Sequence, residues 1–322
     1  METRDEVVNF VTRWSLKTQI PIRHFLRVLN IFPNRFYAWK NRQGLSNRHN
    51  GLLIKSHWLL EWERVAVVEY AKRHPHEGYR RLTFMMLDAD VVAASPSSVY
   101  RVLKKANLLL SKEGQTSKKG TGFIQPNQPH EHWHIDIAHI NIACTFYYLC
   151  SVLDGFSRYI VYHELRERMQ ESDIELILQR AVEKFPGVKP RIISDNGSQF
   201  IAYDFKNYIR EMEMTHVKTS PHYPQSNGKL ERYHRSLKSE CIRQTPMVEL
   251  SFAISQVESY VHYYNTERLH SAIGYITPRD KLQAREAEIF AIRQYKLARA
   301  RRLRLAAQNS AEENGAPLGL ML

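Results

Sequence analysis

The chain has 322 residues, and its 46 Lys and Arg residues outnumber its 33 Asp and Glu residues to give a formal net charge of +13. This length predicts two or three domains. The three cysteines, Cys144, Cys150 and Cys241, lack the paired spacing of a zinc finger and are too few for a disulfide framework. Neither a signal peptide nor a long apolar run is present, so we expect a cytoplasmic, nucleoid-associated protein with no membrane partner.

The positive charge is concentrated toward the ends of the chain. Residues 1–130 carry 21 basic and 10 acidic residues, whereas residues 131–283 carry 18 and 19. Basic segments bind nucleic acid because they neutralise phosphates, whatever the base sequence. We therefore expect DNA as the partner, with binding and chemistry divided between domains. The alternative is that the basic residues serve solubility alone.

Residues 1–58 are predicted to be helical. Within them, Pro21–Asn30 and Pro33–Arg42 form either a helix-turn-helix or an ordinary helical hairpin, and the sequence leaves both open. The apolar residues expected in their shared core are Phe25, Leu26, Leu29, Phe36 and Trp39.

Residues 59–110 are predicted to form a helix-turn-helix DNA-binding domain. The expected helices are Leu59–Arg73, about Arg80–Leu87, and a third with Ser95 as N-cap and Pro96 at its first position. The third helix is the expected reader of DNA, and an ordinary amphipathic hairpin is the alternative. Its expected apolar stripe is Val99, Val102, Leu103 and Ala106, and its expected outward residues are Ser97, Ser98, Arg101, Lys104 and Lys105, of which the last three are candidate DNA contacts.

Three further segments follow. Residues 111–129 have a glycine-, proline- and lysine-rich composition that predicts a flexible basic linker, and residues 130–283 are the expected catalytic core. Residues 284–322 are a predicted basic helical tail, with helix propensity from Arg279 to Ala307 and disorder from Asn309. That helix either lies along a phosphate backbone, packs against a second subunit or is simply solvated.

Three acidic residues stand out in the core. Asp136 lies in an alternating segment, His132–His139, that predicts a strand, and the next apolar run, Thr145–Leu153, predicts an antiparallel neighbour. Asp195 follows a short apolar run and precedes Asn-Gly, which places it at the end of a strand. Glu231 lies in a segment with helical spacing, and thirty-five residues (196–230) separate it from Asp195.

Such a set of acids suits phosphodiester chemistry. An in-line displacement requires charge to be neutralised on the attacking and leaving oxygens together, which a pair of Mg²⁺ ions can do. Mg²⁺ prefers hard oxygen ligands and keeps several waters, so three carboxylates from distant parts of the chain suffice. We therefore expect two Mg²⁺ ions, for which Mn²⁺ can substitute, in a ribonuclease H-like α/β core with a mixed sheet flanked by helices.

The predicted helix around Glu231 also carries a polar face. Steps of three and four residues put Asn227, Glu231, His234, Arg235 and Lys238 on one side. We expect Asn227, Arg235 and Lys238 to contact DNA there, although a solvated or paired lysine is the alternative for Lys238. The nearby histidines His134, His139, His222 and His234 are interpreted as hydrogen-bonding neighbours of carboxylates, and zinc is not expected.

At these residues the chain resembles the DDE transposases of bacterial insertion sequences, of the type called insertion sequence family three, which share their core with retroviral integrases. The resemblance covers about residues 59–280. The matching motifs are Trp133-x-x-Asp136, Leu153-Asp154-Gly155-Phe156-Ser157-Arg158, Ser194-Asp195-Asn196-Gly197 with Phe200, Asn227-Gly228-x-x-Glu231-Arg232, His234-Arg235-Ser236-Leu237-Lys238-x-Glu240, and Asn265-x-x-Arg268-x-His270-x-x-x-Gly274-x-x-x-Pro278.

The resemblance implies a transposase that cuts and transfers DNA strands. It implies that Asp136, Asp195 and Glu231 hold two divalent metal ions and that Lys238 touches DNA near the scissile phosphate. We expect element ends and target DNA as partners, and a homo-oligomer on DNA. The alternatives are a phage- or retroelement-type integrase and a domesticated DNA-binding regulator without catalytic activity.

Overall fold

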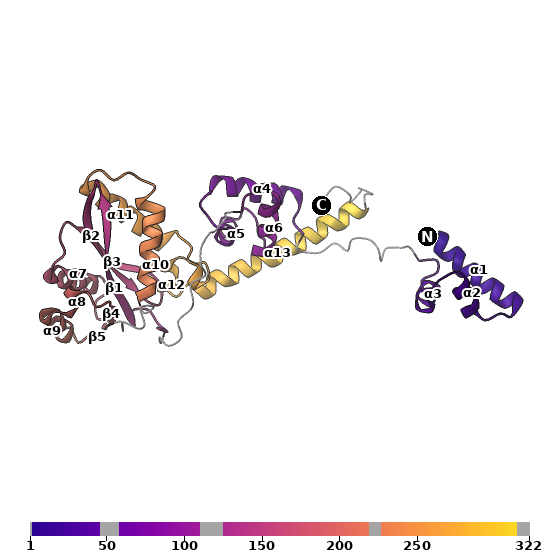
Figure 1. Cartoon of the computed structure of the whole chain (residues 1–322), viewed down its shortest axis with the longest axis horizontal. Helices are drawn as coiled ribbons and strands as arrows, with labels where there is room; N and C mark the ends of the chain where they lie inside the picture. Colours follow the sequence, from indigo (N-terminus) through magenta and orange to yellow (C-terminus); the bar gives the residue numbers. More distant parts are fainter. Residues whose placement is uncertain (1, 46–57, 110–124, 219–226, 314–322) are drawn as a thin grey trace. The chain divides into compact units, whose positions relative to one another are not determined.

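The computed structural model describes residues 2–45, 58–109, 125–218 and 227–313. It contains two compact units, residues 1–55 and 56–322 (Figure 1), and each is described by itself. Among the helices of the described ranges, none is long and apolar enough to cross a membrane.

The first unit is a small helical group. Its helices are α1 (Glu2–Thr18), α2 (Ile22–Val28) and α3 (Pro33–Lys40). Leu26 and Phe36 are buried with Val8 and Val11 of α1, so the two helices predicted within residues 21–42 are confirmed. Leu29 is 42% exposed, and its predicted place in the core is wrong. The reason is that α2 ends before it, and Asn30 then turns the chain with a positive φ of 53°.

The second unit begins with three helices around an apolar cluster. They are α4 (Glu61–Arg73), α5 (Tyr79–Asp88) and α6 (Pro96–Lys105), close to the predicted bounds. Val67, Leu82 and Leu103 are in the cluster. The three helices are thus held together by apolar side chains that each of them contributes.

The third of these helices, α6, starts as predicted. The Ser95 hydroxyl accepts a hydrogen bond from the Ser98 backbone N–H at 3.3 Å and so caps the helix. The predicted outward position of Ser98 and the predicted place of Ala106 in the apolar stripe are wrong. Ser98 is buried, with its Oγ 3.0 Å from that of Ser95, and Ala106 at the end of the helix is exposed.

The expected catalytic core, residues 130–283 and called the catalytic region below, is built on a mixed sheet with the strand order β3-β2-β1-β4-β5. The strands are β1 (His132–Ile142), β2 (Thr145–Asp154), β3 (Ile160–Arg166), β4 (Arg191–Ser194) and β5 (Thr215–Lys218). β1, β2 and β3 form an antiparallel meander, β4 pairs parallel to β1, and β5 pairs parallel to β4. This order, with these directions, is the ribonuclease H-like arrangement predicted from the sequence.

Both faces of the sheet are buried by helices. Trp133 and Ile135 of β1 belong to a cluster with residues of α7 (Glu171–Lys184) and α9 (Tyr203–Glu211). Ile140 and Ile142, on the other face, belong to a cluster with residues of α10 (Gly228–Leu237) and α11 (Leu250–Thr266). Since alternate residues of a strand share a face, Asp136 lies on the α10 side together with Ile140.

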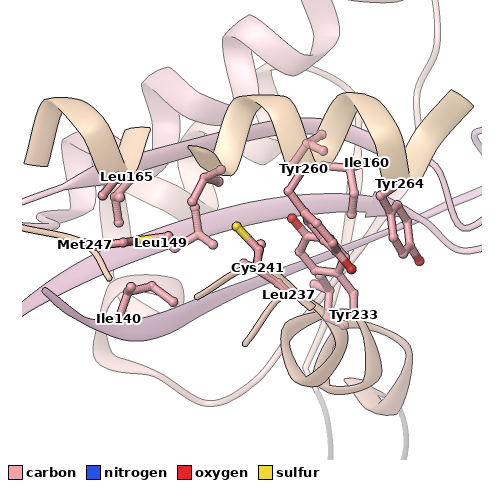
Figure 2. Close-up of a cluster of buried hydrophobic side chains, with 14 of the residues drawn as sticks. Ile140, Leu149, Ile160, Leu165, Tyr233, Leu237, Cys241, Met247, Tyr260 and Tyr264 are labelled. Atoms are coloured by element: carbon pink, nitrogen blue, oxygen red, sulfur yellow. The ribbon is translucent and has the colours of Figure 1, made fainter. Parts of the chain in front are cut away.

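Figure 2 shows the cluster on that side. Tyr233 of α10 and Tyr264 of α11 meet edge to face, with ring centroids 5.1 Å apart. The predicted helical spacing of Leu230, Tyr233, Leu237 and Cys241 is confirmed by their burial. The α-helix does not run through all four residues, however, because it gives way to a π-turn, η3 (Lys238–Ile242).

A tight turn closes the β2–β3 connection. The buried carboxylate of Asp154 accepts hydrogen bonds from the backbone N–H of His130 (2.9 Å) and from the backbone N–H and hydroxyl of Ser157 (2.7 and 2.6 Å). Gly155 packs closely behind it, since a Cβ at this position would lie 3.0 Å from Nε2 of His134. The Leu-Asp-Gly-Phe-Ser-Arg motif is thus a turn held together by one carboxylate.

The remaining elements are short, apart from the last helix. They are α8 (Ser198–Ile201), η4 (Ser271–Ile273), α12 (Pro278–Leu282) and α13 (Glu286–Glu313). The helix predicted from Arg279 to Ala307 is therefore two helices, separated at Ala284, whose φ is +56°. Most of the predicted linker, residues 111–124, lies outside the described residues. The tail beyond Glu313 and His222 also lie outside them.

Two arginines of the long helix α13 are buried, which the sequence did not indicate. Arg293 and Arg304 are buried and pair with Asp88 of α5 and Glu63 of α4. The helix therefore packs against the helical group of its own chain, while most of its other described residues are exposed.

We predict that Asn265 is essential to the stability of the core. Its buried side chain accepts from the Ile160 N–H (2.9 Å) and donates to the Ile160 carbonyl (3.0 Å). Asn265→Leu should lower the free energy of unfolding by about 2–4 kcal/mol, because each buried backbone group left unpaired costs ~1–3 kcal/mol. Chemical denaturation measures this. Ser259→Ala, at an exposed position of the same helix, is the control and should have little effect; an equally stable Asn265→Leu protein would contradict the prediction.

We also predict that acid destabilises the core through His270. This side chain is buried, and its Nδ1 accepts from the Ala272 N–H at 3.2 Å. Burial, with Arg268 and Arg158 nearby, lowers the pKa of His270 from 6.5 to about 3. Its contribution is therefore complete above pH 6.5 and is lost as the pH falls from 6.5 toward 3, at up to about 1.4 kcal/mol per pH unit.

Denaturation curves between pH 4.5 and 8 test this prediction. His270→Asn keeps an acceptor near Nδ1 and removes the titrating ring, so its stability should vary less with pH in this window. Equal slopes for the two proteins would show that His270 is not responsible.

Candidate active site

Asp136 lies in the middle of β1 on the side that faces α10. It is half-buried, and its Oδ1 accepts a hydrogen bond from the Ile137 backbone N–H at 3.0 Å. Its Oδ2 is 3.6 Å from Nδ1 of His234, a buried residue of α10. This neighbour fits the interpretation of the histidines as partners of carboxylates.

Asp195 follows the last residue of β4, as predicted. The β1–β4 pairing matches His134 with Ile193, and two residues further along each strand stand Asp136 and Asp195. The Asp195 side chain accepts from the Gly197 N–H at 2.9 Å, which forms an Asx turn. Parallel pairing thus directs the two aspartates toward the same end of the sheet.

The backbone at Asp195 is supported from β5. The Ser194 hydroxyl donates to the Asp195 carbonyl at 2.9 Å and is 2.8 Å from Nε2 of His216. Burial lowers the pKa of His216 to about 4, so this ring is neutral at physiological pH.

Glu231 lies in the first turn of α10, is exposed, and lines a groove of about 430 Å³ between α10 and β1. The predicted polar face of this helix is confirmed for Glu231, His234, Arg235 and Lys238, which line the groove together. The remaining lining residues are Ile137, Ala138, His139, Ser239 and Arg243. Among the described lining residues, Arg235, Lys238 and Arg243 thus lie with Glu231 in the groove, and their positive charge favours the binding of a polyanion.

Asn227 does not share this groove. It is the buried N-cap residue of α10, and its side chain lies close enough to His134 of β1 to influence the pKa of that ring. Burial, with the positive charges of Lys229 and Arg158 nearby, holds the pKa of His134 well below its ordinary value. Asn227 is therefore buried and does not lie on the exposed surface predicted to contact DNA.

Lys229 is a residue whose environment the sequence did not indicate. Its Nζ donates to the Gly155 carbonyl at 2.9 Å, and burial lowers its pKa to about 7. It ties the start of α10 to the turn after β2, close to Glu231 in sequence.

A second unpredicted contact holds the far end of this helix. Arg268 is buried and donates to both carboxylate oxygens of Glu240 (2.6 and 2.5 Å) and to the Ser236 hydroxyl (3.3 Å). Both residues were visible as motif positions, but their pairing was not. The contact anchors the π-turn that begins at Lys238.

The acids fit a hard divalent cation in their donor chemistry, since carboxylate oxygens are its preferred ligands. Within residues 2–45, 58–109, 125–218 and 227–313, however, no three His, Cys, Asp or Glu side chains converge closely enough to hold a metal ion. The described residues thus bring the acids to one end of the sheet and to the facing helix, but their side chains are not gathered into a metal centre.

The other predicted DNA contacts lie on α6, away from these acids in the chain. Arg101, Lys104 and Lys105 are exposed, as expected, and Nε of Arg101 donates to the Ser97 carbonyl of the same helix at 3.2 Å. Their basic groups are accessible to a phosphate.

Comparisons with known proteins agree on the central region. One integrase core domain model matches residues 126–224, and a second integrase core domain model matches residues 212–278. Together they cover the sheet, all three acids and the motif that ends at Pro278. The transposase for insertion sequence element IS904 of Lactococcus lactis is 26% identical over 175 residues, which are 51% of this chain and 69% of that protein.

A second relative spans more of the chain. The Escherichia coli K12 protein named as transposase InsK for insertion sequence element IS150 is 24% identical over 276 residues, 82% of this chain and 94% of that protein. Among solved structures, the catalytic core domain of BIV integrase is 21% identical, with a TM-score of 0.40 over 50% of this chain and 99% of that one. The chain in the simian T-cell lymphotropic virus intasome is 18% identical, with a TM-score of 0.45 over 67% and 74%.

The sheet order, the positions of the acid motifs and these sequence relatives lead to one assignment. The chain contains an integrase core domain, and its sequence is similar to transposases of bacterial insertion sequences.

Proposed function

We propose that this transposase cuts DNA at the ends of an insertion sequence and joins those ends to target DNA, with Asp136, Asp195 and Glu231 as its catalytic acids. The strongest support is the register of β1 and β4, which leads the two aspartates to matching positions. Glu231 lines the groove against β1 that begins one residue after Asp136. The two alternatives, a phage- or retroelement-type integrase and a non-catalytic regulator, are not favoured by the sequence relatives described above.

The three carboxylates would hold two Mg²⁺ ions, or Mn²⁺ in their place. Such a pair neutralises charge on the attacking and leaving oxygens of an in-line displacement, so no covalent protein–DNA intermediate is needed. His234 lies beside Asp136 and can orient that carboxylate by hydrogen bonding. Lys238 and Arg235 line the same groove and would hold the DNA phosphates next to the acids.

Recognition of DNA would be separate from this chemistry. We propose that α6 reads the element ends through Arg101, Lys104 and Lys105, and that the exposed basic residues elsewhere supply affinity that is independent of sequence. The protein would act on DNA in the cytoplasm. It would act as a homo-oligomer, because the two ends of an element have to be joined to target DNA in one reaction. Asn227, being buried, is the least supported of the proposed DNA contacts.

Removing one acid should abolish catalysis and leave DNA binding largely intact. Asp136→Asn, Asp195→Asn and Glu231→Gln each keep the size of the side chain and remove a charge. Each should lower strand transfer at least about a hundredfold, equivalent to ~2.7 kcal/mol of activation free energy. The assay uses Mg²⁺ and DNA from the flanks of the gene.

Asp204→Asn is the matched control, since Asp204 is exposed on α9, and it should act like the unmodified protein. An acid variant that keeps normal strand transfer would remove that residue from the site, and full activity in EDTA would refute the metal-dependent mechanism.

Replacing Arg101, Lys104 and Lys105 together by Ala should abolish preference for element ends. Base contacts each contribute roughly 1–3 kcal/mol of discrimination, whereas a phosphate contact weakens binding to all sequences alike. Competition binding between end and scrambled duplexes, at one salt concentration, measures the preference. Lys72→Ala with Arg73→Ala, at exposed positions of α4, is the control. A triple variant with unchanged preference would leave α3 as the next candidate reader.

A further inference from the structure

The base of α13 is fixed to the catalytic region. Arg285, which precedes the helix, donates to the Asp280 carboxylate of α12 at 3.0 Å, and its backbone N–H donates to the Asp280 carbonyl at 2.9 Å. Lys281 of α12 also pairs with Glu286 in the first turn of α13. The direction in which α13 leaves the catalytic region is therefore constrained by ion pairs on both sides of the break at Ala284.

One residue of α13 joins three parts of the chain. Arg293 donates to both carboxylate oxygens of Asp88 in α5 (2.8 and 2.6 Å) and to the carbonyls of Gly274 and Tyr275 in the catalytic region (3.2 and 2.7 Å). Its guanidinium also lies over the ring of Phe84, 4.9 Å from the centroid. The helical group, the loop before α12 and α13 thus meet at a single guanidinium.

Aromatic and glycine packing closes this junction. The rings of Phe84 and Tyr275 stack with centroids 4.7 Å apart and planes 17° from parallel. Gly274 has a φ of +82°, and a Cβ at its position would lie only 2.6 Å from the Phe290 ring of α13. The glycine of the family motif is therefore required both by its backbone conformation and by the close approach of this helix.

A second ion pair fixes α13 further along. Arg304 donates three hydrogen bonds to the Glu63 carboxylate, at 2.8, 2.8 and 3.1 Å, and also donates to the Ala93 carbonyl just before α6. Both side chains are 4% exposed. Glu63 in turn accepts from the Leu60 N–H at 2.9 Å and so caps α4. Arg304 therefore contacts the first helix of the group and the entry to its third.

These buried pairs define a geometry more than they add stability. Removing two charges from water costs nearly as much as their attraction returns, so a buried pair is weak evidence for stability, whereas a bidentate pair admits few arrangements of its partners. Two such pairs, eleven residues apart on α13 and made with α5 and α4, leave the helical group little freedom to rotate on the helix.

The same junction leads on to the acid site. The loop at Gly274 and Tyr275 follows Arg268, whose guanidinium binds Glu240 in the π-turn, and that turn continues α10 with Glu231. Contacts at the loop and at the π-turn, joined by the short stretch of chain from Arg268 to Gly274, thus link α5 to the helix that carries the third acid.

We propose that Arg293 and Arg304 are positioning residues that make α13 a spacer of fixed length between the DNA-reading helices and the acid site. The spacer would set how far from the recognised sequence the DNA is cut. The effect on the cut position rests on the proposed function. The rigidity of the arrangement rests on the contacts of α13 alone.

The rigidity is tested without any activity. Spin labels at Ala106→Cys and Ser259→Cys, exposed positions of α6 and α11, are placed in a Cys144→Ser protein that lacks the exposed native thiol. Pulsed dipolar spectroscopy should give one narrow distance distribution. Arg293→Met and Arg304→Met should broaden this distribution. If these two changes unfold the helical group, the milder Asp88→Asn replaces them and should also broaden the distribution. Arg299→Met, exposed on the same helix, is the matched control and should leave the distribution narrow.

The consequence is tested by mapping cut positions on DNA that carries an element end. The unmodified protein and the Arg299→Met control should cut at one phosphodiester. The Arg293 and Arg304 variants should cut at several neighbouring phosphodiesters. On DNA that lacks the end, these variants should cut as much as the unmodified protein does. A broad distribution in the unmodified protein, or an unchanged one in the variants, overturns the proposal, as does a single cut position in variants with broadened distances. If no protein cuts DNA with any divalent metal, the proposed function fails, and the distance distributions still decide whether α13 is a rigid spacer.

Discussion

The parallel pairing of β4 with β1 is the constraint on which the rest of the catalytic region depends. β1 is buried by helices on both faces and bonded to strands at both edges, so its residues cannot change side or slide without loss of the whole core. With this register fixed, Asp136 faces α10, and the chain leaves β4 at Asp195 at the same end of the sheet. A one-residue slip would turn the aspartate into the α7 cluster and expose apolar side chains.

The elements that the sequence predicted correctly are those with local causes. Alternation around Asp136, the Asn-Gly turn after Asp195, the Ser95 cap and the spacing of Leu230 to Cys241 depend on neighbours within a few residues, and each is present in the structure. The ribonuclease H-like topology was predicted from the order and spacing of the three acids. The first helix of the chain, α1, has a mixed surface without a clear apolar period, and only its contacts with α2 and α3 explain it.

What the sequence did not reveal depends on residues far apart. Arg268 binds a carboxylate 28 positions away, and Arg293 and Arg304 bind carboxylates 205 and 241 positions away. An arginine in an exposed basic helix has the same local pattern whether it is solvated or buried in an ion pair, so the burial of Arg293 and Arg304 was not predicted. Asn227 was misplaced for a related reason: helical spacing was extended to a cap residue whose φ and ψ (−97° and 4°) lie outside the helix.

The π-turn after α10 has a consequence for the family's sequence pattern. A π-turn holds one residue more than an α-helical turn, so Glu231, Arg235 and Lys238 keep the phase of α10, whereas Glu240 is rotated out of it, toward Arg268. One continuous segment thereby serves two surfaces, the groove and α11. The number of residues from Glu231 to Glu240 is then as constrained as their identities, and this stretch should tolerate neither insertion nor deletion as the family diverges.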